Sequence, residues 1–503
     1  MTTVLATMAI AFLTSLVGTL TARRVALRIG LTDRPDGHRK TQREPVALGG
    51  GAAVLVGLLT SLAAVWVLPN PLRERLLENA HDIGILLAAG GAIVLLGLAD
   101  DRFSLRGRQK LVGQVLVTLM LALAGFTIRK LRIFDVNIEM GLLSIPFTVF
   151  WLLGAINALN FIDGIDGLAS TVGIILSMAI GILAMLTGHF TEGIVAWAFA
   201  ASLLGFLCFN FPPARIYLGD AGSMLIGLIV GALAIRASLK GPATVALAAP
   251  LAIWTIPIFD VTAAIVRRRL TGRSVYTTDR GHLHHRLLDA TGNNALVVAM
   301  IGVACAVTCA GATLSVHYNN DLLAFFSVVP VVGILVATRV FGHVEVLLLT
   351  THVRALGRSM LRPAPRGGDD PVEASFRLQG SRPWDEIWEA LTEFADKLDL
   401  SAIQLDVNLP ALAEDFHASW RRPSQRQLEE QWKTEIPLWM GSQRIGRLVV
   451  SGERRAGSSC AHIERLMDLL EPLETRLIHM AAGTLAVEKP TRAGILVAPG
   501  ADR

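Results

Sequence analysis

Long runs of apolar residues alternate with short polar loops over the first two thirds of the chain. Windows of about 17–22 mostly apolar residues are long enough to cross a bilayer as helices. The pattern predicts eleven such helices, over residues 4–22, 47–68, 82–98, 111–128, 143–160, 169–187, 191–210, 218–236, 242–265, 295–314 and 322–342. Only 17% of the 503 residues are charged, against about a quarter in soluble domains. We therefore expect a polytopic α-helical membrane protein whose first helix is not a cleaved signal peptide.

Positive charge is distributed unequally between the loops that join these helices. Odd-numbered loops hold more than twice as many Lys and Arg residues as even-numbered loops. Because Lys and Arg accumulate on the cytoplasmic side, the odd loops are expected in the cytoplasm and the N-terminus outside. The net charge of +5 is attributed to this bias. A nucleic-acid partner is excluded, since no basic patch is interleaved with stacking aromatic residues.

The composition changes after the last apolar run. Residues 1–352 form the predicted membrane domain, and residues 353–371 form a basic linker rich in Pro and Gly. Residues 372–485 predict a small cytoplasmic α+β domain, and residues 486–503 a flexible tail. Within the α+β domain the periodicity predicts a helix over 384–398, a strand over 401–409, a hairpin over 433–452 turning at Gly441-Ser442, and an amphipathic helix over 462–481. No catalytic motif is recognised there, which favours a regulatory or assembly role.

Five polar segments interrupt the apolar background, and all five fall in odd-numbered loops. They are DRPDGHRKTQREPVALGG (33–50), LGLADDRFSLRGRQKLVGQ (96–114), NALNFIDGIDGLAS (157–170), NFPPARIYLGDAGS (210–223) and RRRLTGRSVYTTDRGHLHHRL (267–287). Loops of the same parity face the same side of a membrane. The sequence therefore predicts one cytoplasmic site assembled from five loops.

Aspartates are the most informative residues of these segments. Asp100 and Asp101 end a predicted helix, where carboxylates oppose the helix dipole and repel each other by roughly 4 kcal/mol at an effective dielectric near 20. A divalent cation or a shared proton would offset that repulsion, and a solvated helix end is the alternative. Asp163 and Asp166 share one face if their segment is helical. With Asp220, these carboxylates suit Mg²⁺, which takes one or two carboxylates together with phosphates and water.

Amide and cationic side chains complete the inventory. Asparagine side chains both donate and accept hydrogen bonds and suit a base or a sugar, whereas three histidines within four residues indicate an anion-binding site rather than a zinc site. Lys110 and Arg102 are suited to phosphates. The residues concerned are Asn157, Asn160, Asn210, His282, His284 and His285. A divalent cation, a phosphate-rich substrate and a membrane-embedded reactant together indicate phosphoryl transfer at a membrane surface.

Four of the motifs carry a family resemblance. LADDR, NALNFIDGIDGLAS, NFPPARIYLGDAGS and GHLHHRL, in that order, resemble the polyprenyl-phosphate N-acetylhexosamine-1-phosphate transferases, the superfamily with WecA and MraY branches. The resemblance covers roughly residues 1–345. It implies transfer of a sugar-1-phosphate from a UDP-sugar to undecaprenyl phosphate with release of UMP, the first membrane step of a cell-envelope polysaccharide pathway. It also implies a requirement for Mg²⁺, with Mn²⁺ as a substitute, and a bacterial inner membrane location; homodimer formation is left open.

The resemblance also implies roles for individual residues. Asp220 would be the metal ligand, with Asp163 beside it, and Asp100 or Asp101 would act as base or nucleophile near the lipid phosphate. The implied uridine-side contacts are Asn210, Tyr217 and Asp166, and the implied phosphate-side contacts are Lys110, His282, His284 and His285. Asn157, Asn160 and Arg102 complete the expected substrate contacts.

Several details favour the WecA branch, which uses GlcNAc-1-phosphate. The histidines follow an H-x-H-H pattern, the paired aspartates are followed by Arg102, and an eleventh span precedes the tail. The first loop departs from the branch, with RKTQ and Ala47, which leaves Lys40 a weak candidate contact. A phospho-MurNAc-pentapeptide transferase is the alternative enzyme. A transporter is disfavoured because the polar groups face one side only.

Overall fold

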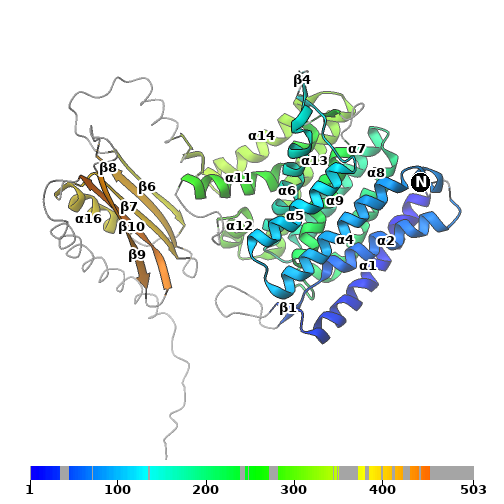
Figure 1. Ribbon diagram of the computed structural model, residues 1–503, viewed down its shortest axis with the longest axis horizontal. Helices are drawn as coiled ribbons and strands as arrows, with labels where there is room; N and C mark the ends of the chain where they lie inside the picture. Colours follow the sequence, from blue (N-terminus) through cyan, green and yellow to red (C-terminus); the bar gives the residue numbers. More distant parts are fainter. Residues whose placement is uncertain are drawn as a thin grey trace, which may run out of the picture. The chain divides into compact units, whose positions relative to one another are not determined.

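The computed structural model divides into two compact units, Met1–Leu349 and Thr350–Arg503 (Figure 1). Its described residues are 2–33, 45–70, 72–133, 136–237, 244–246, 248–270, 281–343, 345–347, 349–350, 372–379, 384–397, 400–409, 414–422, 431–440 and 443–453.

The first unit is almost entirely helical. Its helices are α1 (Thr2–Ile29), α2 (Gly50–Val67), α3 (Arg73–Glu78), α4 (Ala80–Phe103), α5 (Gly107–Leu123), η1 (Gly141–Leu143), α6 (Ser144–Ile162), α7 (Leu168–Leu186), α8 (Phe190–Asn210), α9 (Gly219–Ala237), α10 (Ala248–Ile253), α11 (Thr255–Leu270), α12 (Leu283–Thr291), α13 (Asn294–His317) and α14 (Asp321–Ala337). Short strands join some of them: β1 (Thr32–Asp33) pairs with β2 (Val46–Ala47), and β3 (Lys130–Ile133) lies between β4 (Val136–Glu139) and β5 (Thr244–Ala246).

Eight helices among the described residues are long and apolar enough to cross a membrane. They are α1, α2, α4, α6 together with η1, α7, α8, α9 and α13. The protein is therefore a multi-pass helical membrane protein, as predicted. Of the other predicted spans, α5 and α14 are helices of 17 residues each, so the count of eleven stays a prediction.

The predicted span 242–265 is wrong as a single helix. It is divided between α10, which ends at Ile253, and α11, which begins at Thr255. Pro257 lies in the first turn of α11 and has no N–H to donate to the carbonyl of Ile253. A proline is tolerated in a first turn but interrupts a helix that would continue through it.

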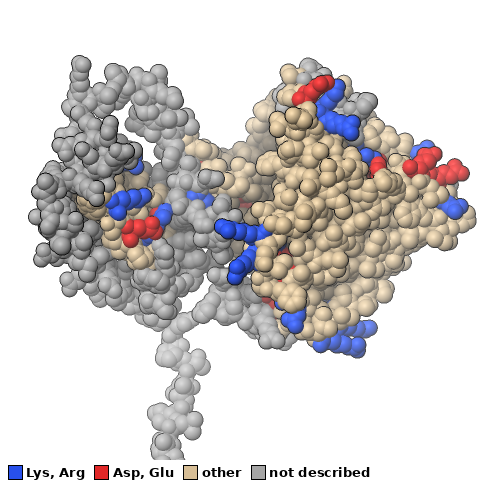
Figure 2. Space-filling model, in the orientation of Figure 1, with Lys and Arg blue, Asp and Glu red and all other residues tan. Residues whose placement is uncertain are grey.

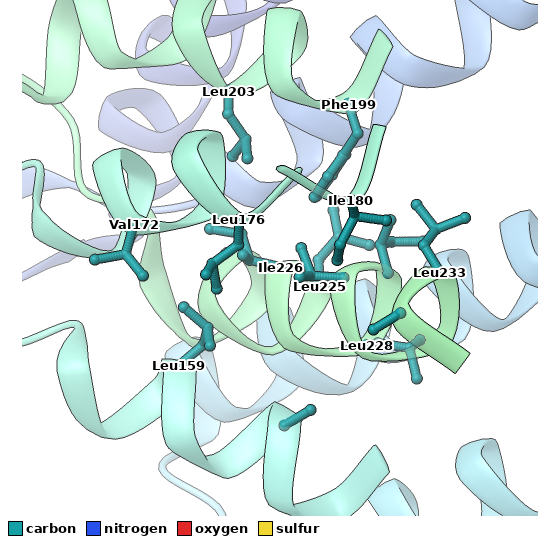
Figure 3. Close-up of a cluster of buried hydrophobic side chains, with 14 of the residues drawn as sticks. Leu159, Val172, Leu176, Ile180, Phe199, Leu203, Leu225, Ile226, Leu228 and Leu233 are labelled. Carbon is teal, nitrogen blue, oxygen red and sulfur yellow. The ribbon is translucent and has the colours of Figure 1, made fainter. Parts of the chain in front are cut away.

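Helix α9 forms the centre of the first unit. Every residue from Ala221 to Ala237 is buried except Arg236. Figure 3 shows α9 side chains such as Leu225 and Ile226 meeting residues of α6, α7 and α8. Small residues bring the helices close: a Cβ on Gly227 would lie 2.5 Å from the Ala155 carbonyl oxygen of α6. The helix is therefore held on all sides by other helices.

Charged side chains of the first unit lie mainly toward the ends of its helices, with an uncharged surface between them (Figure 2). At one end Arg236 pairs with Asp82 and, at 3.3 Å, with Glu192. Between the ends, exposed side chains such as Leu95 and Phe150 are apolar. This distribution is typical of a protein whose middle lies in hydrocarbon.

The second unit contains an antiparallel five-stranded sheet of order β6-β8-β7-β10-β9, with α16 (Trp384–Lys397) contributing to its core. The strands are β6 (Val372–Gln379), β7 (Ala402–Leu409), β8 (Glu414–Arg421), β9 (Gln431–Met440) and β10 (Gln443–Glu453). The predicted helix over 384–398, the strand over 401–409 and the two paired strands of the hairpin are confirmed, whereas β6 and β8 were not predicted. The predicted turn at Gly441-Ser442 lies outside the described residues. The predicted helix over 462–481 lies outside the described residues.

Candidate active site

Two aspartates and a lysine meet at one end of the first unit. Asp100 lies in the last turn of α4, Lys110 in the first turns of α5 and Asp220 in the first turn of α9. The Lys110 Nζ lies 2.9 Å from Asp100 Oδ2 and 2.7 Å from Asp220 Oδ2. Lys110 therefore supplies a positive charge between Asp100 and Asp220, whereas the expected cation or proton shared by Asp100 and Asp101 stays a prediction. A network of opposite charges of this kind is stable away from water only while every member is paired.

Asp101 faces the N-terminus of α9. Its Oδ1 accepts a hydrogen bond of 2.9 Å from the Asp220 backbone N–H. Its Oδ2 is buried and, among the described residues, has no hydrogen-bond partner. A Cβ on Gly219 would lie 2.5 Å from that oxygen, and Gly219 has a φ of +72°. Only glycine adopts this backbone geometry at low cost and leaves room for the carboxylate.

Asparagine side chains of α6 join this network. Asn160 donates from Nδ2 to Asp220 Oδ1 and, at 2.9 Å, to Ser223 Oγ, while its Oδ1 accepts from Lys110 at 3.3 Å. Asn157 lies one turn further back and donates to Gln114 Oε1 at 3.0 Å. Asn160 is thus part of the carboxylate network, and Asn157 supports it from behind.

The segment that holds Asp163 and Asp166 is not a helix, so the condition under which both would lie on one helical face is not met. Helix α6 ends at Ile162 and α7 begins at Leu168, with glycines in the connecting turn. Asp166 turns away and accepts from the Ala214 backbone N–H at 2.9 Å. Burial, reinforced by the charges of Asp220, Asp101 and Asp166, raises the pKa of Asp163 well above its usual value. Asp163 therefore lies within electrostatic range of the carboxylate network.

Backbone contacts hold Tyr217, in the loop between α8 and α9, against the segment that precedes α2. The Tyr217 N–H donates to the Ala47 carbonyl at 2.8 Å, and the Tyr217 carbonyl accepts from Gly50 at 3.1 Å. Burial, together with the charges of Asp166 and Asp33, raises the pKa of the Tyr217 hydroxyl. Asp166 is therefore close enough to act on the Tyr217 hydroxyl electrostatically, and the expected uridine contacts of both residues stay a prediction.

Asn210 lies deeper than its expected role suggests. Its side chain is buried, accepts from Ser170 Oγ at 2.9 Å and donates to the Ile216 carbonyl at 3.0 Å. Both ends of its amide are therefore used to anchor the loop between α8 and α9.

The three histidines lie at the start of α12. His282 is its N-cap residue, and its ring stacks with those of Phe161 and His284, at centroid distances of 5.7 and 5.8 Å. A Cβ on Gly164 would lie 2.3 Å from His284 Nε2, which places the histidines against the turn that holds Asp163. Burial, assisted by the charge of His285, lowers the pKa of His284 to about 3.

The remaining candidates are less closely tied to this network. Arg102 is exposed, and no bond from it to another candidate residue is found among the described residues. Lys40 lies outside the described residues.

Three residues that carry or support the site were not predicted: Ser223, Gln114 and Asp260. An acidic residue inside the apolar segment 242–265 was the available signal for Asp260.

The donor set suits Mg²⁺ better than a metal held by protein alone. Among the described residues, no three His, Cys, Asp or Glu side chains converge as a ready metal cage. Mg²⁺ does not need one, since it takes one or two carboxylates and completes its shell with substrate phosphates and water. The buried, unpartnered Oδ2 of Asp101 and the nearby carboxylates of Asp163 and Asp220 are hard oxygen donors of that kind.

Close packing at Gly97 fixes α4 against α9, and a methyl group there is expected to be disruptive. A Cβ on Gly97 would lie 2.2 Å from Ala221 Cα. We expect Gly97→Ala to lower the unfolding free energy by about 1–3 kcal/mol through overpacking and to reduce activity by separating Asp100 from Asp220. Gly91→Ala, in the same helix with no atom within 4 Å, is the control. Thermal unfolding in detergent checks this, and equal midpoints for the two variants would contradict it.

Comparison with known proteins identifies relatives of this chain. Residues 83–238 match the model of glycosyl transferase family 4. A probable undecaprenyl-phosphate N-acetylglucosaminyl 1-phosphate transferase of Bacillus subtilis is 32% identical over 58% of this chain and 80% of its own length. A decaprenyl-phosphate N-acetylglucosaminephosphotransferase of Mycolicibacterium smegmatis is 31% identical over 63% of this chain and 83% of its own. The undecaprenyl-phosphate alpha-N-acetylglucosaminyl 1-phosphate transferase of Escherichia coli K12 is 29% identical over 56% and 76%.

These matches place a multi-pass membrane protein with a carboxylate-lined site in a known class. The chain belongs to glycosyl transferase family 4, the superfamily of polyprenyl-phosphate N-acetylhexosamine-1-phosphate transferases. Within that superfamily it is a WecA-like member. The second unit lies beyond the residues that match the family model.

Proposed function

We propose that the protein transfers GlcNAc-1-phosphate from UDP-GlcNAc to a polyprenyl phosphate and releases UMP. The observation that carries the proposal is the network of Asp100, Lys110, Asn160 and Asp220, with Asp101 and Asp163 beside it, in a chain whose relatives are named for this reaction. The proposed setting is the bacterial inner membrane, with the site and the second unit in the cytoplasm. UDP-GlcNAc and the polyprenyl phosphate are the proposed partners.

In the proposed reaction, an oxygen of the lipid phosphate bonds to the β-phosphorus of the UDP-sugar. The bond between that phosphorus and the oxygen bridging to the α-phosphate breaks, and UMP leaves. A phosphate monoester has a second pKa near 6, so the lipid phosphate is mostly a dianion at pH 7 and needs no base. The aspartates are therefore assigned to positioning and charge neutralisation rather than to a covalent intermediate.

Asp220 and Asp163 would hold Mg²⁺, and the free Oδ2 of Asp101 faces the same region. When bound, the ion would neutralise charge on the phosphates. Lys110 is held between two carboxylates with its ammonium oriented toward the site, where it can also contact a phosphate oxygen. Asn160 donates from Nδ2 to Asp220 Oδ1 and so holds the Asp220 carboxylate in one orientation.

The experiment that tests the function offers two donors to membranes that contain the protein. With a polyprenyl phosphate acceptor, UDP-GlcNAc is expected to give a lipid-linked product and an equivalent amount of UMP. UDP-MurNAc-pentapeptide is the competing donor. Product from UDP-MurNAc-pentapeptide alone would assign the protein to the MraY-type reaction and refute the proposal.

Removing the second unit is expected to leave the transfer reaction intact. That unit has a hydrophobic core of its own, which includes Trp384 and Phe416, and it holds none of the candidate site residues. A chain that ends at residue 371 should therefore keep the kcat and the KM values of the full chain, measured in the same membranes. A truncated protein that is folded but inactive would show that the second unit takes part in catalysis.

A further inference from the structure

Asp260 is a buried carboxylate that the reaction scheme above leaves without a role. It lies in α11 with 1% of its surface exposed. Its Oδ2 lies 3.0 Å from His282 Nδ1, and its Oδ1 accepts from the Leu283 backbone N–H at 2.8 Å. A carboxylate in such a place is costly unless its oxygens are bonded. Both oxygens of Asp260 are directed to the start of α12, where the histidines lie.

The ring of His282 is held from three directions. The rings of Phe161 and His284 both stack with it, at interplanar angles of 18° and 10°. Asp260 fixes the rotation of the ring within that stack through Nδ1. The second ring nitrogen, Nε2, has no hydrogen-bond partner among the described residues. Unlike the nitrogens of His284, it is not fully buried. One nitrogen is thus used for anchoring, and the other is left for a ligand.

The neighbouring histidine has a different environment. His284 is 2% exposed, and both of its ring nitrogens are buried without a partner in the described part of the chain. His282 differs from His284 in having a carboxylate partner, since its Nδ1 lies 3.0 Å from Asp260 Oδ2. A buried carboxylate bonded to a histidine favours the positively charged ring.

We propose that Asp260 is a positioning residue for His282: it keeps the proton on Nδ1 and directs Nε2–H toward a phosphate oxygen of the substrate. This inference rests on the proposed function, which supplies the diphosphate of a nucleotide sugar as the anionic ligand. A carboxylate partner fixes the tautomer and the orientation of a functional histidine and makes the ring more basic. A charged donor then forms a stronger bond to an anionic oxygen than a neutral one.

Asp260→Asn separates this role from a structural one. The Asn side chain keeps a carbonyl oxygen for the Leu283 N–H but places an NH₂ group against Nδ1. Nδ1 would then have to accept from that NH₂ group, and the ring would lose its negatively charged partner. We expect kcat/KM for the UDP-sugar to fall by about 10- to 100-fold, the usual cost of losing such a partner, with an unchanged thermal midpoint. Asp260→Ala, which also removes the acceptor for Leu283, should lower the midpoint as well.

A double-mutant cycle shows whether Asp260 acts through His282. In a His282→Gln background, Asp260→Asn is expected to cause little further loss, because the group it positions is gone. An equal fold-loss in both backgrounds, or full activity of Asp260→Asn alone, overturns the inference.

If Asp260→Asn does not fold, Asp260→Glu and Asp260→Gln are compared. They have similar size, and only the first keeps the charge, so equal activity of the two overturns the inference.

The same assays separate this inference from the proposed function. If the parent protein forms no product from UDP-GlcNAc and polyprenyl phosphate, the proposed function fails. If the parent protein is active and the cycle shows no coupling, the function stands and only the role of Asp260 is refuted.

Discussion

Replacing Asp220 by Asn is expected to reduce sugar-phosphate transfer by roughly 10²- to 10³-fold, because metal-assisted charge stabilisation contributes several kcal/mol and each 1.36 kcal/mol is tenfold in rate. The variant keeps the size of the side chain but loses the charge that faces Lys110 and the proposed Mg²⁺. An amide oxygen is a weaker ligand than a carboxylate for a hard cation. Raising the Mg²⁺ concentration should therefore restore little of the rate.

The measurement is the initial rate of UMP release across a range of Mg²⁺ concentrations, for the parent protein and the variant. Glu78→Gln, which also removes one negative charge but lies on the exposed surface of α3, is the control and should match the parent protein. Normal activity of Asp220→Asn at every Mg²⁺ concentration would refute the assignment of Asp220 as a metal ligand.

The second large effect is expected at Lys110. Lys110→Met would leave Asp100 and Asp220 without their shared cation, and breaking a buried ion pair on one side typically costs about 3–5 kcal/mol. Only 16% of the Lys110 side chain and 10% of the Asp100 side chain are exposed, so water would compensate little for the lost ammonium at Asp100. We expect a lower unfolding midpoint in detergent and a loss of activity of at least about 10²-fold, since the remaining carboxylates would repel an incoming phosphate.

Lys130→Met provides a matched control. Lys130 also forms an ion pair of 2.7 Å, with Glu139, but both side chains are exposed by about half or more. Exposed pairs contribute about 0–1 kcal/mol. Equal effects of the two substitutions on the unfolding midpoint would show that burial does not strengthen the Lys110 network.

The sequence predicted the helices well because each is defined by its own run of apolar residues. The predictions from sequence failed where contacts between helices determine the local backbone structure. The interruption at Trp254 depends on how α10 and α11 pack around Pro257, and the turn at Asp163 depends on the packing of α6 against α7. Strand β5 pairs with β3, which lies far from it in the chain, and no local pattern of a few residues indicates such pairing.

The site residues were found from polar segments in an apolar background, but their partners were not. The motifs indicated that Asp100, Lys110 and Asp220 act together, and the structure joins them. The distances between charged groups in the folded chain decide which of them form ion pairs, and a sequence does not contain those distances. Lys110 was therefore expected to face phosphates rather than carboxylates. Asp260 was missed because a single carboxylate in an apolar segment has no partner until α11 and α12 are placed together.

The buried position of α9 has a consequence for how the protein responds to its membrane. In the most apolar window of α9, 89% of the residues are buried inside the protein, against 22% in α1. Thinning or thickening of a bilayer acts on the helices that contact lipid, which tilt or shift to restore the hydrophobic match. Asp220 stands at the end of a helix that is screened from those forces. We therefore expect the helices that contact lipid to tilt or shift when the lipid chain length changes. The proposed metal ligand is expected to keep its position in membranes of different thickness.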